Sequence, residues 1–97
     1  MKVCRVVGDV VSTHKSEMMM GFKLLVVQPV DIYDISKTQG SPYVAVDTVG
    51  AGEGEIVLVV AGSSSRLTEL TNKKPVDAAI MGIIDYITIQ GEKTFSK

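Results

Sequence analysis

Few residues of the kinds that make disulfides or metal sites occur in this chain. Its 97 residues include one cysteine, Cys4, and one histidine, His14. A single cysteine cannot form an internal disulfide, and this fits a reducing compartment. Zinc sites need several Cys or His ligands close together, and the sequence offers no such cluster. The sequence therefore excludes a disulfide scaffold and contains no recognisable metal centre.

An excess of charge of either sign and long hydrophobic runs are also missing. Ten Lys and Arg residues face eleven Asp and Glu residues, so the formal net charge is −1. That balance gives no electrostatic case for binding nucleic acid. No apolar run is long enough to span a bilayer, and Arg5 and Asp9 make the N-terminal segment unlike a signal peptide. We therefore expect a cytoplasmic protein with neither a membrane nor a nucleic-acid partner.

Motifs for catalysis and cofactor binding are absent as well. Gly62–Arg66 lacks the closing glycine of the G-x-S-x-G nucleophile elbow. The glycines of Gly50–Gly54 have the wrong spacing for a dinucleotide fingerprint, and they lead into a strand pattern instead of a helix. The neighbouring acids Glu53 and Glu55 would repel a pyrophosphate. We expect no enzyme and no cofactor.

The chain is long enough for one small domain, residues 1–97, with a modest core. It is 45% hydrophobic and 22% charged, and a domain of this size buries roughly 60–68% of its unfolded surface. The hydrophobic share is high for a small monomer. A buried subunit interface explains the excess, and a weakly packed monomer is the alternative.

Hydrophobic alternation predicts five strands. The first covers residues 3–11, with Cys4, Val6, Gly8 and Val10 on the core face. The others are Lys23–Gln28, Tyr43–Val49, Glu55–Ala61 and a strand from Met81 or Gly82 to Gln90.

The connections between these strands carry the remaining expectations. Pro29 is expected to end the second strand, and Asp31–Pro42 is expected to be mostly loop. A short helix is predicted near Arg66–Leu70 and a turn at Asp77–Ala79. Residues 91–97 are expected to form a mobile tail, unless Phe95 docks on a neighbour. Five strands and one short helix predict an all-β chain that forms a small, partly open barrel.

The most informative segment is residues 46–66. Two strand patterns flank the alternating glycines of Gly50–Gly54, whose backbone can take positive φ or approach other backbone closely. One interpretation is a tight hairpin turn, and the other is a loop that contacts a neighbouring subunit or lines a narrow opening. Arg66 either caps carbonyls locally or pairs with Glu53 or Glu55 of a neighbour.

Other residues in the loops have simpler interpretations. His14 is interpreted as a solvated loop residue, with a contact at an interface as the alternative. Asp47 and Asp77 are expected to hold turns. Met18–Met20 either cover one end of the barrel or form an adaptable contact surface.

Six stretches in sequence order carry a resemblance to a known family: Val6–Lys15, Gly21–Asp31, Val44–Glu55, Gly62–Arg66, Pro75–Ile80 and Gly82–Asp85. Together they resemble the EutN/CcmL family, the pentameric vertex proteins of bacterial microcompartment shells. Ser65 stands where the family often has alanine.

The resemblance implies an OB-like barrel of five strands with one short helix. It also implies a homo-pentamer that fills the vertices of a cytoplasmic polyhedral shell tiled by hexameric shell proteins. The residues expected at the subunit interface or central pore are Gly50, Ala51, Gly52, Glu53, Gly54, Ser63, Ser64, Ser65 and Arg66. The alternative is an OB-type nucleic-acid-binding module, which the dispersed aromatic residues and the net charge disfavour.

Overall fold

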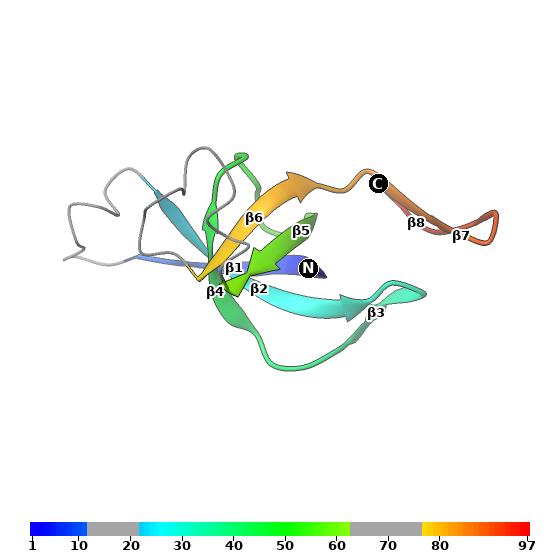
Figure 1. The fold of residues 1–97 in the computed structure, drawn as a ribbon, viewed down its shortest axis with the longest axis horizontal. Coiled ribbons are helices and arrows are strands. Elements are labelled where there is room, and N and C mark those ends of the chain that lie inside the picture. Colours follow the sequence, from blue (N-terminus) through cyan, green and yellow to red (C-terminus); the bar gives the residue numbers. More distant parts are fainter. Residues whose placement is uncertain (12–21, 63–76) are drawn as a thin grey trace.

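The fold consists of β-strands arranged as a barrel with a projecting hairpin (Figure 1). The computed structural model describes residues 1–11, 22–62 and 77–97. This part of the chain contains no helix, and so none that is long and apolar enough to cross a membrane. The predicted helix at Arg66–Leu70 lies outside the described residues. The strands are β1 (Lys2–Val10), β2 (Lys23–Asp31), β3 (Asp34–Thr38), β4 (Tyr43–Asp47), β5 (Ile56–Ala61), β6 (Ala78–Ile83), β7 (Tyr86–Ile89) and β8 (Glu92–Ser96).

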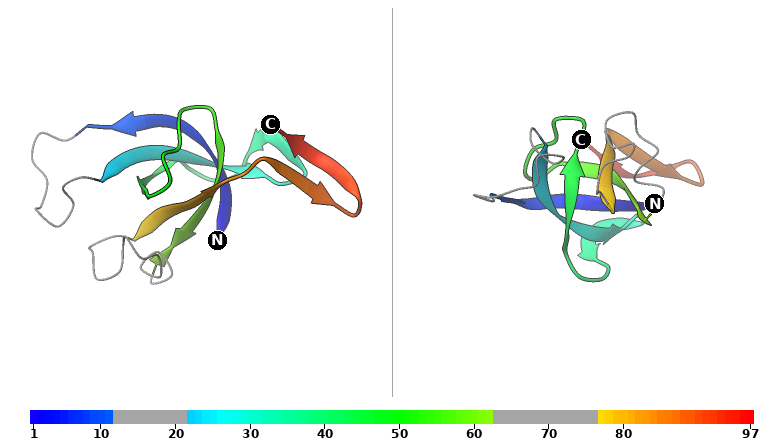
Figure 2. Two further views of the ribbon diagram at one scale, coloured as in Figure 1. Left: turned by 90° about the horizontal axis from the view of Figure 1, so that it is seen from above. Right: turned by 60° about the vertical axis from the view of Figure 1, so that its left-hand side comes forward.

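Five of these strands close into a barrel. They follow the order β1-β5-β6-β4-β2, and β1 pairs with β2 to complete the circle (Figure 2). The pairs are antiparallel except β4–β6, which is parallel. The prediction of a small five-stranded all-β barrel is confirmed. The barrel is closed instead of partly open, because β1 is long enough to pair with β2 and β5 at the same time.

The core lies inside the barrel, where the inward-facing side chains of all five strands meet. The alternation predicted for the first strand is confirmed, since Cys4 and Val6 are 0% and 1% exposed. Strand β5 reads as a nearly continuous apolar run, and four of its six residues are buried. Burying a valine, leucine or isoleucine side chain contributes about 1.5–3 kcal/mol. Other buried members of this core are Leu25, Val27, Ala45, Val57, Val59 and Ile80.

Strand β2 does not end at Pro29, as the sequence pattern predicts, but continues to Asp31. Pro29 lies opposite Cys4 in the terminal pair of the β1–β2 ladder. A proline, which has no N–H to donate, is tolerated in such a position. Its carbonyl still accepts a hydrogen bond of 2.8 Å from the Gln39 N–H.

Strand β3 replaces part of the loop expected over Asp31–Pro42. It pairs with the end of β2 after a two-residue turn. The Asp31 side chain accepts a hydrogen bond of 2.8 Å from the Tyr33 N–H and so fixes this turn. A local side-chain bond of this kind offers the backbone a turn that hydropathy does not reveal.

The single strand predicted over residues 81–90 is two strands. A break at Ile84 and Asp85 separates β6 from β7, and the Ile84 N–H donates to the Ile56 carbonyl at 2.8 Å. Ala78 and Ala79, expected in a turn after Asp77, belong to β6 and are buried. Their small side chains fit where β6 lies between β4 and β5.

Residues 91–97, expected as a tail, complete a hairpin. Strand β8 pairs with β7 across the two-residue turn Gln90–Gly91, whose φ angles are 51° and 84°. Two consecutive positive φ angles define the type I′ turn, which favours glycine and suits the twist of a two-stranded hairpin. This hairpin projects from the barrel (Figures 1 and 2). The mobility of the segment stays a prediction.

Candidate functional site

The glycine loop, residues 48–55, joins β4 to β5 and contains the first five of the predicted contact residues. Gly50 and Gly54 have φ angles of 80° and 89°, which only glycine adopts without strain. Gly52 has no positive φ, and a Cβ added to it would lie 3.4 Å from the Glu55 Oε1 atom. The loop therefore requires glycine at two positions for its backbone, but not at Gly52.

Asp47, at the end of β4, holds the start of the loop. Its side chain is 8% exposed, and Oδ1 accepts hydrogen bonds of 3.0 Å from the N–H groups of Val49 and Gly50. Next to it, the Thr48 hydroxyl donates to the Ile80 carbonyl at 2.7 Å. The prediction that Asp47 holds a turn is confirmed.

Glu55 holds the end of the loop. Its Oε1 accepts from the Gly52 N–H at 2.6 Å, and its Oε2 forms an ion pair of 3.0 Å with Lys97 Nζ. The pKa of Glu55 is lowered below its ordinary value. The hydrogen bond from Lys97 is the larger cause, and the hydrogen bond from Gly52 is the next. Both carboxylate oxygens are therefore already bound within the chain.

Backbone bonds connect the loop to β1. The Gly54 N–H donates to the Val6 carbonyl at 2.8 Å, and the Val6 N–H donates to the Glu55 carbonyl at 2.9 Å. The Ala51 side chain is 1% exposed and packs in the core, while Lys23 Nζ lies 3.4 Å from the Ala51 carbonyl. The loop is thus fixed against the barrel wall.

The exposed part of the loop consists of Val49, Gly50, Glu53 and Gly54, with Gly52 half-buried. Within the described residues, the Glu53 side chain forms no hydrogen bond or ion pair. It borders a small hollow of about 170 Å³ together with Asp9 and Lys23. The loop therefore presents backbone, the Val49 side chain and one free carboxylate to its surroundings.

Several predicted residues cannot be placed beside the loop. Ser63, Ser64, Ser65 and Arg66 lie outside the described residues, as do His14 and Met18–Met20. Conversely, sequence reasoning missed Lys97 as a partner of Glu55. The two residues are 42 positions apart, and no spacing rule connects them.

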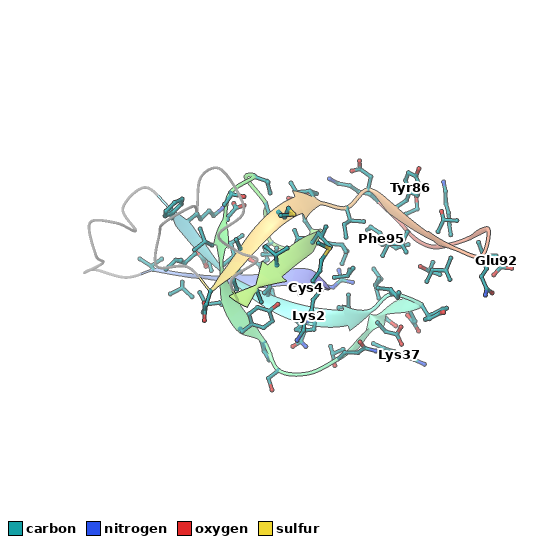
Figure 3. All side chains as sticks on the ribbon, viewed as in Figure 1. Lys2, Cys4, Lys37, Tyr86, Glu92 and Phe95 are labelled. Carbon is teal, nitrogen blue, oxygen red and sulfur yellow. The ribbon has the colours of Figure 1, made fainter. Side chains whose placement is uncertain are left out.

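Cys4 is the other group with potential chemistry. Cys4 is labelled in Figure 3. Its Sγ lies 3.7 Å from the Tyr43 hydroxyl, and burial raises the pKa of the Cys4 thiol. A thiol in this state is a poor nucleophile, because the thiolate is the reactive form. No group of three or more metal-ligating side chains occurs among residues 1–11, 22–62 and 77–97.

Comparison with known proteins decides the family. The family model described as "Ethanolamine utilisation protein EutN/carboxysome" matches residues 1–85. The chain belongs to the EutN/CcmL family. The match to the EutN/CcmL family model ends at residue 85, immediately before β7. The closed barrel is therefore the part of this chain that the family model covers.

Individual relatives agree with this assignment. GrpN of Rhodospirillum rubrum, a bacterial microcompartment shell vertex protein, is 48% identical over 83 residues, which are 86% of this chain and 91% of GrpN. The structure of CcmL from Nostoc sp. PCC 7120 is 40% identical with a TM-score of 0.91 over 100% of both chains. The structure of GrpN, described as a pentameric microcompartment shell protein, has a TM-score of 0.80 at 45% identity, with 92% of this chain and 99% of GrpN covered.

Proposed function

We propose that this chain is a structural protein that forms the pentameric vertices of a bacterial microcompartment shell. The observation that carries this function is the family match over residues 1–85, together with relatives that are themselves named shell vertex proteins. Carboxysomes and related microcompartments lie in the cytoplasm, so the chain works there.

The role of a vertex is geometric. Hexagonal tiles alone make a flat sheet, and pentagons supply the curvature that closes a polyhedral shell. A ring forms when each subunit repeats one heterologous contact and the rotation per subunit closes the circle. Each chain therefore has four further copies of itself as partners within the ring, and the ring has the surrounding hexameric shell proteins as its partners.

The glycine loop suits a structural role within this ring. The carboxylates of Asp47 and Glu55 hold its backbone, and two of its four exposed residues are glycines. Glycines allow the backbones of two subunits to approach more closely than side chains would permit. The loop and the segment Ser63–Arg66 form the proposed contact, or line the central opening, of the ring.

Glu53 is the preferred partner for Arg66 of a neighbouring subunit. Glu55 is already paired with Lys97 at 3.0 Å, whereas Glu53 is exposed and has no side-chain partner within the described residues. A planar guanidinium can bind a carboxylate through two parallel hydrogen bonds. A double-mutant cycle of Arg66→Ala and Glu53→Gln should give a coupling energy for ring formation, whereas Arg66→Ala with Glu55→Gln should give almost none. Zero coupling in both cycles would reject the pairing.

The function is tested by the mass of the intact particle and by shell closure. Native mass spectrometry should show five 10.4-kDa chains, and cells that lack the protein should form open or elongated shells in electron micrographs. A hexamer would contradict the vertex role, and a monomer would leave only the fold. Gly52→Val should lower the pentamer fraction, because a side chain would keep the backbone of a neighbouring subunit from approaching closely. Within the chain, a Cβ at this position would lie at an ordinary contact distance of 3.4 Å from Glu55 Oε1. An unchanged pentamer would remove Gly52 from the interface.

No observation favours the nucleic-acid-binding alternative. A single-stranded oligonucleotide that binds with strong salt dependence would revive it.

A further inference from the structure

Glu55 connects two parts of the chain that lie far apart in the sequence. Its Oε1 atom accepts a hydrogen bond of 2.6 Å from the Gly52 N–H, and a backbone bond of 3.2 Å from the Glu55 N–H to the Gly52 carbonyl completes the same turn. Its Oε2 atom binds Nζ of Lys97, the residue that follows β8, at 3.0 Å. One carboxylate therefore joins the glycine loop to the end of the β7–β8 hairpin.

The hairpin depends on individual contacts for its position. It projects beyond β6 as a separate two-stranded sheet (Figure 1). The Lys97 N–H donates to the Asp85 carbonyl at 2.8 Å, which places the end of β8 beside the point where β7 begins. Thr94 Oγ1 donates to the Ile32 carbonyl on the β2–β3 turn at 2.6 Å. A two-stranded hairpin alone is marginally stable in water, so each contact with the barrel affects where it lies.

The rest of the glycine loop is held without this carboxylate. The Val49 and Gly50 N–H groups each donate to Asp47 at 3.0 Å, and the Gly54 N–H donates to a β1 carbonyl at 2.8 Å. The Gly52 N–H differs from these three donors, because its acceptor is itself bound by a side chain at the end of the hairpin. A movement of the hairpin should therefore affect Gly52 before it affects the other three.

The two contacts of Glu55 support each other because they need the same side-chain conformation. Fixing a long glutamate side chain costs conformational entropy. Once Lys97 has fixed the carboxylate, the bond to Gly52 forms without a second cost of this kind. The Glu55 and Lys97 side chains are 26% and 53% exposed, so water competes for the carboxylate whenever one partner leaves. The coupling acts in both directions, as linkage requires.

We propose that Glu55 and Lys97 form a latch through which the position of the β7–β8 hairpin controls how tightly the Gly52 turn is held. With the hairpin in place, Lys97 orients the carboxylate toward the Gly52 N–H. When the hairpin moves away, the carboxylate turns to water and the Gly52 N–H opens more often. The latch lies within one chain and does not depend on the pentamer. It passes a displacement of the hairpin to the loop that we assign to the contact or opening of the ring.

Amide hydrogen exchange of the full chain, resolved by residue with NMR spectroscopy, tests the latch. Lys97→Met removes the charge and keeps an unbranched side chain. The Gly52 amide should then exchange about two- to fivefold faster, the size of effect expected for an exposed ion pair. The Val49 and Gly50 amides should keep their rates, and Lys97→Arg should keep the wild-type rate at Gly52. An unchanged Gly52 rate, or an equal increase at all three amides, would overturn the latch.

Salt gives a second measurement on the same amide. Between about 0.01 M and about 1 M ionic strength, the Debye length falls from roughly 30 Å to roughly 3 Å. Exchange at Gly52 should accelerate with salt in the wild type and respond far less in Lys97→Met. Arg5, whose Nη1 lies 3.4 Å from the Gly54 carbonyl, and Glu53 are present in both proteins, so their response to salt cancels in the comparison. Equal responses of the two proteins would contradict the latch.

Native mass spectrometry of the same samples separates this inference from the proposed function. A pentamer without the specific response at Gly52 refutes only the latch. Another oligomer that shows the response refutes the vertex role and leaves the latch standing. If Lys97→Met changes the mass of the particle, the wild-type salt response decides: acceleration at Gly52 that exceeds that at Val49 and Gly50 supports the latch, and equal acceleration overturns it.

Discussion

Replacement of Asp47 by alanine should destabilise the barrel by about 2–3 kcal/mol. The buried carboxylate accepts two hydrogen bonds of 3.0 Å, from the Val49 and Gly50 N–H groups. A hydrogen bond to a charged group contributes about 1.5–3 kcal/mol. Val49 and Gly50 are themselves exposed, so water compensates part of the loss and the total stays near the value of one strong bond.

Thermal and urea unfolding followed by circular dichroism would measure this effect. For a domain of this length, a loss of about 2–3 kcal/mol lowers the Tm by roughly 8–24 °C. All variants must be compared at one subunit concentration, because assembly makes the Tm depend on concentration.

Asp47→Asn is the matched control. An amide oxygen can still accept both hydrogen bonds, but without the charge, so this variant should lose about half as much stability. The free energy of unfolding should decrease in the order wild type, Asp47→Asn, Asp47→Ala. An alanine variant within about 0.5 kcal/mol of wild type, the usual range for an inert surface change, would refute the role of Asp47 as the anchor of the glycine loop.

Three further predictions follow from the same structure. Gly54→Ala should cost about 1–2 kcal/mol because its φ is 89°, while Gly52→Ala should leave chemical unfolding nearly unchanged. The pKa of Glu55 is lowered from 4.5 in the folded protein. Its contribution to stability is therefore present above pH 4.5 and is lost as the pH falls through the folded pKa. Glu55→Gln or Lys97→Met should flatten this part of the acid-unfolding curve, and an unchanged curve would reject the ion pair. Ile80→Val, at a side chain with 0% exposure, should cost about 0.5–1.5 kcal/mol in urea unfolding, and no cost would show that the core relaxes around the lost methylene.

The barrel strands could be predicted from the sequence because burial imposes their pattern directly. Cys4 and Val6 alternate with more exposed neighbours in β1, and β5 is apolar along most of its length. Each pattern lies within a few consecutive residues. A local reading is therefore enough to find strands whose faces differ in burial.

The two outer hairpins were missed for local reasons. Pro29 suggested a strand end, although the terminal position of its pair in the ladder makes the proline harmless. The second hairpin did carry a signal, since Ile87 and Ile89 alternate before Gln90–Gly91 and Phe95 follows on the return strand. A polar-residue–glycine pair between alternating runs predicts a two-residue hairpin.

The candidate site shows where sequence reasoning ends. Asp47 could be recognised as a turn residue because its partners lie two and three positions ahead. The partner of Glu55 is Lys97, and only the tertiary structure brings the two together. The position of a long-range ion pair depends on the path of the whole chain.

The pairing of distant strands in the closed barrel has a consequence for how the protein folds. Strand β1 must find β5 across more than half of the sequence, and Val46 of β4 pairs with Ala79 of β6. Chains dominated by such contacts fold in milliseconds to seconds, because loop closure precedes most of the favourable contacts. No subset of the five barrel strands forms a complete core, so the barrel should fold in one cooperative step. Ring assembly then starts from finished barrels.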